Sequence, residues 1–232
     1  MKILVTGVAG FIGSHIAWKL SELGYDVWGF DRDSDLPEEA DVVVHCAANL
    51  YHDFDENIEL TKKLIFLYPK AKFIFTSSAA VYGDTVRATE DQQLKPYGAY
   101  GYSKMFEETM IREFVDNYTI FRLSNVCGYN SDHGIYQKII KGKTKLNNNG
   151  NSVRDFVHVK DVRDVVIRAI IDPRKWQGTF NIASGEGVSI RALFYKLNRH
   201  QDHIDSGCLK EITVSTLSIE KAKGNGFRPR KL

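Results

Sequence analysis

Tyr100 and Lys104 have the residue types and the spacing of a proton-transfer pair. They stand four positions apart in a segment of helical periodicity, so both side chains lie on one face of the predicted helix. A free tyrosine has a pKa of about 10, and a neighbouring ammonium favours the phenolate and lowers that pKa toward neutral pH. Tyr97 and Tyr102 have no lysine four residues later, which singles out Tyr100.

Ser78 is the third residue with suitable chemistry. It ends the apolar run 73–78, which predicts a buried strand. A hydroxyl at the carboxyl end of a strand can hold a substrate and relay its proton to Tyr100. The structural alternative is that Ser77 and Ser78 only cap a turn while Tyr100 packs on the sheet, and the choice between the two depends on the start of the chain.

The first 20 residues predict a strand, a glycine-rich turn and a helix. The apolar run 3–5 is followed at once by Gly7, Gly10 and Gly13, and apolar residues then recur at helical spacing. Glycines in such a turn permit the bend, the approach of a pyrophosphate and close packing of helix on strand. The helix N-terminus then faces the phosphates. This context predicts a dinucleotide site, whose cationic nicotinamide would be a second charge that favours the Tyr100 phenolate.

Asp31 follows the second apolar run, residues 25–30, 24 positions after Gly7. An acid at the end of this strand accepts hydrogen bonds from both adenosine ribose hydroxyls and repels a 2′-phosphate. The sequence therefore favours NAD over NADP. Arg32, the next residue, could instead pair with a phosphate, so the alternative cofactor stays open.

The order of the remaining elements predicts an α/β fold with a Rossmann-like, doubly wound parallel sheet. Predicted strands at 42–48, 73–78 and 119–123 alternate with helices at 55–67 and 99–115. We expect residues 1–128 to form a dinucleotide-binding domain, with the helix 161–171 packed back on it. Residues 129–232 are expected to form a small C-terminal substrate-binding lobe. The acidic segment 33–41 is too brief for the strand and helix that usually stand there.

Composition places the chain among ordinary globular proteins. It has 232 residues, 43% of them hydrophobic and 26% charged, and a net charge of +2 with both signs interspersed. We therefore expect no nucleic-acid surface, and no apolar run approaches the roughly 18 residues of a membrane helix. The chain opens directly on a strand, so no leader is expected. The three widely spaced cysteines, Cys46, Cys127 and Cys208, suit a reducing cytoplasm.

His45 ends the predicted strand that begins at residue 42. It could be a ligand or a base, but no partner lies near it in the sequence. A packed histidine hydrogen-bonded to the backbone is the favoured interpretation. We predict no metal site, because the cysteines also lack metal-ligand spacing.

The motifs together resemble the extended short-chain dehydrogenases/reductases, in particular the nucleotide-sugar epimerase/dehydratase family. The resemblance covers nearly the whole chain, and its segments follow the family's order. The matching segments are Thr6-Gly7-Val8-Ala9-Gly10-Phe11-Ile12-Gly13, His45-Cys46-Ala47-Ala48, Ser77-Ser78-Ala79-Ala80-Val81-Tyr82-Gly83, Tyr100-Gly101-Tyr102-Ser103-Lys104, Arg122-Leu123-Ser124-Asn125-Val126-Cys127-Gly128, Arg154-Asp155-Phe156-Val157-His158-Val159 and Phe180-Asn181-Ile182.

The resemblance implies a role for individual residues. Ser78, Tyr100 and Lys104 would be catalytic, and Asn125 and Arg154 would hold the diphosphate of a nucleotide-sugar. Arg154 suits this role because guanidinium binds phosphate in a bidentate manner; its alternative is a salt bridge to Asp155 or Asp161. The dinucleotide would lie on Phe11, Ile12, Asp31, Arg32, Ala47, Ala48 and Asn57, with Asp35 and Leu36 touching the adenine.

The two residues after Ser78 distinguish the family's reactions. The 4,6-dehydratases of the family carry Asp-Glu there, whereas this chain has Ala79-Ala80, which cannot move protons. The pattern resembles a 4-epimerase, which would oxidise C4 of a UDP-sugar to a transient ketone and return the hydride to the other face, with tightly held NAD. The alternatives are an NAD(P)-dependent reductase of a keto-sugar or other carbonyl, and a non-catalytic dinucleotide-binding protein.

The family also implies an assembly and a size. Relatives commonly dimerise through the helix that carries Tyr100 and the helix before it, so a homodimer is expected. Departures from the family are the short segments 31–41 and 48–72 and an end at Leu232, where relatives usually continue into a further helix. The substrate lobe is therefore expected to be small.

Overall fold

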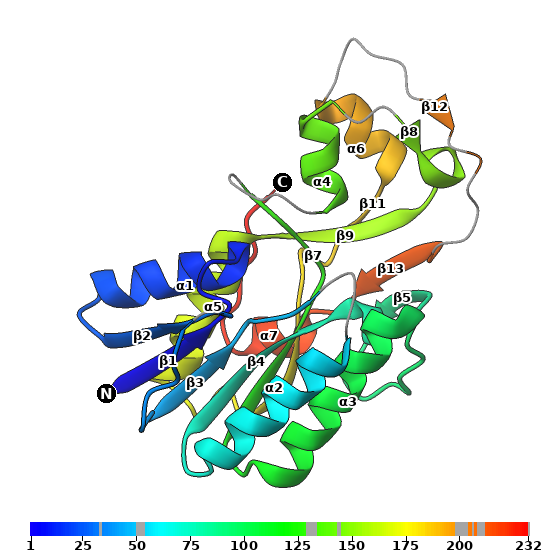
Figure 1. The fold of residues 1–232 in the computed structure, drawn as a ribbon. Helices are drawn as coiled ribbons and strands as arrows, with labels where there is room; N and C mark the ends of the chain where they lie inside the picture. The colour runs from blue at the N-terminus through cyan, green and yellow to red at the C-terminus, as the bar shows by residue number, and fades with distance from the viewer. Residues whose placement is uncertain are drawn as a thin grey trace.

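The fold is built on one six-stranded sheet (Figure 1). The structure is a computed structural model that describes residues 1–32, 34–49, 54–128, 134–142, 145–197, 204–205, 207 and 212–231. All strand pairs of this sheet are parallel, in the order β10-β6-β4-β3-β1-β2, so the predicted doubly wound parallel sheet is confirmed. The strands are β1 (Lys2–Thr6), β2 (Asp26–Phe30), β3 (Val42–His45), β4 (Lys72–Ser78), β6 (Tyr118–Leu123) and β10 (Gly178–Ile182).

Helices cover both faces of the sheet because its strands are apolar on both sides. In β1, Ile3 and Val5 point to the face covered by α1 (Phe11–Glu22) and α5 (Val159–Ile171). Leu4 points to the other face, which α2 (Phe54–Leu67) and α3 (Gly98–Phe114) cover. As predicted, the helix that begins near residue 161 packs back on the first domain, where it contacts α1.

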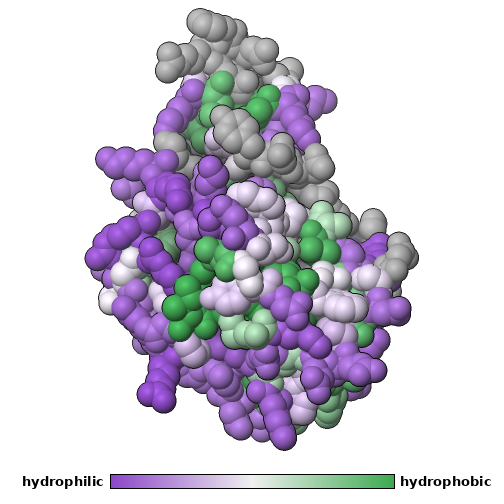
Figure 2. All heavy atoms as spheres, turned by 90° about the vertical axis from the view of Figure 1, so that its left-hand side faces the viewer, coloured by the Kyte–Doolittle hydropathy of each residue, from purple (hydrophilic) through white to green (hydrophobic). Residues whose placement is uncertain are grey.

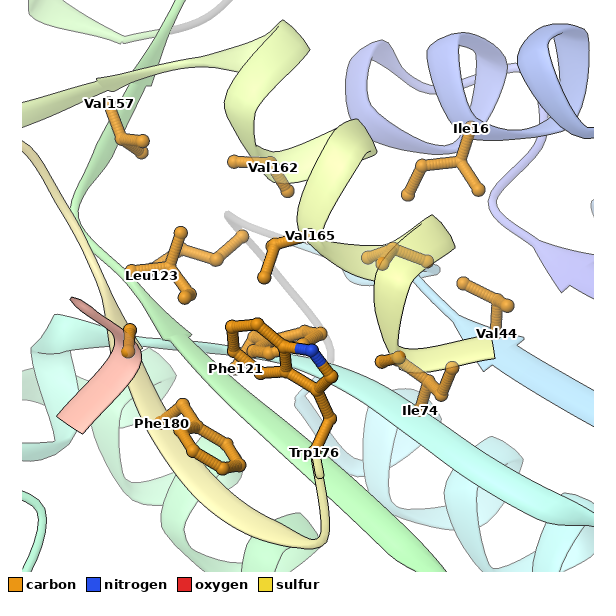
Figure 3. Close-up of a cluster of buried hydrophobic side chains, with 14 of the residues drawn as sticks. Ile16, Val44, Ile74, Phe121, Leu123, Val157, Val162, Val165, Trp176 and Phe180 are labelled. Atoms are coloured by element: carbon orange, nitrogen blue, oxygen red, sulfur yellow. The ribbon is translucent and has the colours of Figure 1, made fainter. Parts of the chain in front are cut away.

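Aromatic side chains fill the larger of the two cores (Figure 3). Trp176 is 1% exposed, and its ring centroid lies 4.9 Å from that of Phe180 and 5.7 Å from that of Phe121. Val162 and Val165 of α5 approach this cluster from above, as Figure 3 shows. Truncating such a buried aromatic costs about 3–5 kcal/mol, so this cluster fixes α5 on the sheet.

A second sheet carries the smaller lobe. Its strands are ordered β11-β9-β13-β5, and β7 also pairs with β9. The helices of the lobe pack on an apolar cluster of their own that includes Phe156 and Phe194. The elements are β5 (Thr85–Ala88), β7 (Asn125–Cys127), α4 (Ile135–Ile140), β8 (Lys145–Leu146), β9 (Val153–His158), β11 (Gly187–Ser189), α6 (Ile190–Leu197), β12 (Ile204–Asp205), β13 (Val214–Leu217), α7 (Glu220–Gly224) and the 3₁₀ turns Ala79–Val81 and Asn147–Gly150.

The two sheets do not divide at residue 128. β10 lies beyond that residue yet pairs with β6 in the main sheet, and β5 comes before it yet pairs with β13 in the second sheet. The sequence did not predict β5 or β13, because each has only four residues and its partner lies more than 100 positions away. The chain therefore crosses between the two parts more than once.

The connection 31–41 contains no helix or strand among its described residues, 31–32 and 34–41. In the described part of the chain, β2 is therefore the edge strand of the main sheet. Figure 2 looks onto this side of the molecule and shows an apolar patch surrounded by hydrophilic side chains. Trp28 of β2 is 45% exposed, and its indole N–H donates to the Asp35 carbonyl at 3.1 Å. The connection thus folds back beside the edge strand.

Three smaller observations concern the described residues alone. None of their helices has the length and apolar character needed to cross a bilayer. They contain no cluster of three side chains suited to hold a metal ion. Cys46 and Cys127 are free thiols, and Cys208 lies outside the described residues.

Candidate active site

The glycine turn forms a cradle in which neither Gly7 nor Gly13 could carry a side chain without a clash. Gly7 has φ +69°, and a Cβ on it would lie 2.7 Å from the Ala47 nitrogen. A Cβ on Gly13 would lie 2.2 Å from the Gly7 carbonyl oxygen. The N-cap of α1 is Gly10, whose lack of a side-chain cap leaves the first N–H groups of the helix available. The turn therefore presents N–H groups and a helix dipole to an anion such as a pyrophosphate.

Two adjoining cavities open on either side of this turn, at the carboxyl ends of the strands. The inner cavity has a volume of about 530 Å³ and the outer cavity about 430 Å³. They share the glycine turn and the segment after β3. They lie where the strand order reverses between β1 and β3, which is where open α/β sheets bind ligands. The shared lining residues are Gly7, Gly10, Arg32, Cys46, Ala48 and Asn49.

Asp31 lies in the outer cavity, and its contact with an adenosine ribose stays a prediction. Its Oδ2 accepts a hydrogen bond from the Ala9 N–H at 3.0 Å, which ties the end of β2 to the glycine turn. Arg32 lines both cavities, and its guanidinium lies 3.6 Å from the carboxylate of Glu56 in α2. The two charged groups thus form an ion pair in the lining of the outer cavity.

The rest of the predicted dinucleotide residues divide between the cavities and the core. Phe11, Ile12 and Gly13 line the inner cavity, and Ala47 and Asn57 the outer. Asn57 also fixes the segment after β3, since its side chain accepts from the Asn49 N–H at 2.6 Å and donates to the Asn49 carbonyl at 3.0 Å.

Asp35 and Leu36 line neither cavity. Leu36 packs on the core under α2 and α3, and Asp35 is exposed with its carbonyl bonded to Trp28. The short connection from β2 to β3 turns this pair away from the cavities. Their contact with an adenine stays a prediction.

Ser78, Tyr100 and Lys104 meet in the inner cavity. Ser78 ends β4, where its Oγ accepts the Ala80 N–H at 3.2 Å and where it lines the same cavity as Tyr100. The helix α3 brings Tyr100 and Lys104 to the same wall. Tyr100 differs from the expectation in one respect: burial raises its pKa above the ordinary value, and Lys104 only partly offsets this effect. The lysine alone does not produce a phenolate.

A buried network connects this wall to the sheet. Lys104 is 1% exposed and lies 3.3 Å from the carboxylate of Glu107, which receives a hydrogen bond from Thr61 at 2.8 Å. Thr61 in turn bonds the Nε2 of His45 at 2.8 Å, and the Nδ1 of His45 lies 2.7 Å from the Thr6 hydroxyl. His45 is packed, as predicted, but its ring bonds to these hydroxyls rather than to the backbone.

Glu108, the next residue, belongs to a separate network behind the wall. Its carboxylate accepts from Ser77 at 2.5 Å, from Arg112 at 2.8 Å and from Arg122 at 2.7 Å. Burial raises the pKa of Glu108, but the hydrogen bonds and charge of Arg122 outweigh burial and hold it below the usual value. This network attaches α3 to β4 and β6, which fixes the position of Ser78.

Asn125 and Arg154, the predicted diphosphate ligands, are not brought together. Asn125 lines the inner cavity, and its Nδ2 donates to the Asp155 carbonyl at 3.0 Å. Arg154 lines neither cavity, and its guanidinium donates to the carbonyl groups of Ile212 at 2.5 Å and Val153 at 3.0 Å. A role for Arg154 toward a diphosphate remains a prediction that requires its guanidinium to move.

The two carboxylates considered as salt-bridge partners of Arg154, those of Asp155 and Asp161, contact other residues. Asp155 accepts from the hydroxyl of Ser184 at 2.6 Å, and Asp161 pairs with Arg230.

Sequence reasoning also missed Glu107 and Thr61 as neighbours of Lys104. The spacing of Glu107, three residues after Lys104, was the available signal, since such pairs face each other on a helix.

Comparisons with known proteins agree with this geometry. A sequence model of the NAD dependent epimerase/dehydratase family matches residues 3–183. A protein of Methanocaldococcus jannaschii assigned as a UDP-glucose 4-epimerase is 31% identical, over 98% of this chain and 93% of its own. An ADP-L-glycero-D-manno-heptose-6-epimerase of Nitratidesulfovibrio vulgaris is 30% identical, over 84% of this chain and 81% of its own.

Among solved structures, the UDP-glucose 4-epimerase of Thermus thermophilus in complex with NAD has a similar fold. Its TM-score is 0.81 at 24% identity, over 99% of this chain and 94% of that one. The glycine cradle and the two cavities fit a dinucleotide, and the predicted cofactor, NAD, agrees with the description of the matching family.

Proposed function

The chain belongs to the NAD-dependent epimerase/dehydratase family, and from this premise we propose that it epimerises a nucleotide-diphosphate sugar, at C4 of a UDP-sugar. The observation that carries the proposal is the composition of the inner cavity. It contains the hydroxyl of Ser78, the phenol of Tyr100 and the ammonium of Lys104, and its described lining includes no carboxylate. These groups suit one proton transfer at one carbon.

Dehydration requires a different set of groups. An elimination at neighbouring carbons needs an acid and a base beside Ser78, where this chain has Ala79 and Ala80. Ala79 is buried, and the Ala80 N–H is used to bond Ser78. The backbone at this position therefore orients the serine and supplies no proton donor.

The roles of the protein side chains follow from their positions. Ser78 lines the inner cavity together with Tyr100, so it would hold the sugar hydroxyl and relay its proton to the Tyr100 oxygen. Lys104 supplies a fixed positive charge that favours the phenolate. The glycine cradle and Asp31 would hold the dinucleotide across the two cavities. Bound NAD supplies a hydride acceptor and donor and is regenerated in each turnover.

Asn125 and Arg154 are proposed to recognise the diphosphate. Asn125 already lies in the inner cavity. Arg154 would exchange its bonds to backbone carbonyls for charge-assisted bonds to phosphate, which are about twice as strong as neutral ones. Substrate binding would then move the residues near 212–213 that now accept its hydrogen bonds.

The test is incubation of the purified protein with NAD and a panel of UDP-, GDP-, dTDP- and ADP-sugars, with product NMR at each sugar carbon. Inversion at C4 without net NADH formation, lost in Tyr100→Phe, supports the proposal and identifies the substrate. Inversion at another carbon would correct the position. Stoichiometric consumption of NAD(P)H with keto-sugars would instead indicate a reductase, and NAD binding with neither reaction a non-catalytic protein.

We also propose that the protein is a homodimer that pairs α2 and α3 with the same helices of a second copy. These helices expose Phe66 and Phe114 by 67% and 61%, with ring centroids 6.5 Å apart. Exposed neighbouring aromatics of this kind are typical of an interface. The double variant Phe66→Lys/Phe114→Lys should elute as a monomer in size-exclusion chromatography with light scattering, while Trp18→Lys on α1 (62% exposed) should not.

A further inference from the structure

Glu107 is a buried counter-ion of Lys104. Its side chain is 0% exposed, and its two oxygens lie 3.3 and 3.4 Å from the Lys104 Nζ. The ammonium also lies over the ring of Phe75, 4.4 Å from its centroid. A buried charge is costly without a partner of opposite sign, so each of the two residues stabilises the charged form of the other.

A chain of hydrogen bonds leads from β1 to the Glu107 carboxylate. Thr61 donates its one hydroxyl proton to Glu107, so the Thr61 oxygen accepts from the Nε2–H of His45. The Nδ1 of His45 then accepts from the Thr6 hydroxyl. In this direction each donor points toward the carboxylate, which is the arrangement of an ionised Glu107, paired with Lys104, and a neutral His45. Burial, and then the charge of Lys104, lower the pKa of His45 well below its usual value, in agreement with this assignment.

The charges of Lys104 and Glu107 act on Tyr100 in opposite directions. After the dominant effect of burial, which raises the pKa of Tyr100, Lys104 lowers it and Glu107 raises it again. His45 is neutral and burial raises the pKa of the Cys46 thiol to about 12, so neither carries a charge at neutral pH. Arg32 also lines the inner cavity, but its side chain is 75% exposed and lies 3.6 Å from the Glu56 carboxylate, so water and that carboxylate weaken its effect. The field of Lys104 at the phenol is therefore opposed mainly by that of Glu107.

We propose that Glu107 is a positioning residue that keeps Lys104 charged while offsetting part of its field at Tyr100, so that Tyr100 retains its proton until a cationic nicotinamide enters the inner cavity. The phenol then releases its proton to solvent and accepts one from the sugar hydroxyl. When the ring is reduced and neutral, the phenol holds its proton. The proposal rests on the proposed function only in assigning Tyr100 as the base.

The test is a pH titration of Tyr100 in the protein without substrate, by NMR of protein labelled at the tyrosine Cζ. The signal that is missing in Tyr100→Phe identifies the residue. Glu107→Gln preserves the volume and the bond from Thr61 but removes the charge, and we expect the Tyr100 midpoint to fall by about one pH unit. An unchanged midpoint would reduce Glu107 to a structural role. A rise would mean that Lys104 loses its proton without Glu107, and would overturn the proposed offset.

Glu113→Gln is the matched control, because it makes the same charge change at an exposed position of the same helix, α3. Its Tyr100 midpoint should equal that of the wild type. A second measurement needs no variant at Glu107: in the wild type, oxidised NAD should lower the Tyr100 midpoint and NADH should restore it. Equal midpoints in both states would contradict the proposal. Because no sugar is present, failure of the epimerase assay and failure of this proposal are separate results.

Discussion

The inner and outer cavities hold their charges in opposite ways. At the inner cavity, Lys104 in the lining and Glu107 behind it are 1% and 0% exposed and belong to a chain of hydrogen bonds that reaches β1. In the outer cavity, the side chains of Arg32 and Glu56 are 75% and 56% exposed. Water and salt screen charges at the surface, whereas buried charges act on one another strongly. Under the proposed function, catalysis would depend on fixed internal charges, and cofactor choice on exposed, adjustable ones.

The largest expected effect is at the base of the inner cavity. Tyr100→Phe removes the proton acceptor, and turnover should fall roughly 10³-fold, within the range of general acid–base catalysis. NAD affinity, measured by calorimetry, should change little. Tyr102→Phe is the control, because Tyr102 is 50% exposed and lies outside both cavities. A similar loss of turnover in both variants would show that the effect is not specific to the tyrosine in the inner cavity.

The second effect is on stability and arises behind the inner cavity. Glu108→Gln leaves the buried Arg122 without its carboxylate and should lower the free energy of unfolding by about 3 kcal/mol. Because the folded pKa of Glu108 lies below its usual value, its contribution is present above the unfolded pKa of about 4.3 and is lost as pH falls through the folded value. Denaturation across acidic pH should therefore show a weaker pH dependence in the variant.

A third variant tests the cradle that the two cavities share. In Gly13→Ala the new methyl group would lie 2.2 Å from the Gly7 carbonyl oxygen, so backbone must move, at a cost of about 1–3 kcal/mol. We expect a lower midpoint of thermal denaturation and weaker NAD binding. Gly224→Ala, where nothing lies within 4 Å of the new atom, should show neither change.

The smallest effect belongs to the outer cavity. Asp31→Asn should weaken NAD binding about tenfold, or about 1.4 kcal/mol, because a neutral amide accepts weaker hydrogen bonds from the ribose. NADP binding should improve relative to NAD, as the repulsion of a 2′-phosphate is lost. The ratio of the two Kd values should depend on salt. A loss of NAD affinity in Asp31→Asn as large as the loss of turnover in Tyr100→Phe would show that the outer cavity matters as much as the inner one.

Local signals in the sequence predicted the elements around the site, and long-range contacts account for the errors. The glycine turn, the run before Ser78 and the Tyr100–Lys104 spacing are each short segments whose pattern determines their structure. The position of Arg154 depends instead on carbonyls near residue 212, 58 positions away. The bond from Thr61 to Glu107 was missed because Thr61, on another helix, is 46 positions away. The raised pKa of Tyr100 reflects burial, which spacing alone does not reveal.

The position of β2 at the edge of the sheet has a consequence for how such chains vary in length. The common doubly wound order places a further strand outside the second one, whereas here β2 is outermost in the described sheet. Asp31 is nevertheless held at the glycine turn, through the pairing of β1 with β2 and its bond to Ala9. The cofactor-binding half of the fold can therefore differ in its number of strands at the sheet edge that β2 forms. The connection 31–41 is a place where a strand and a helix can be gained or lost without displacing Asp31.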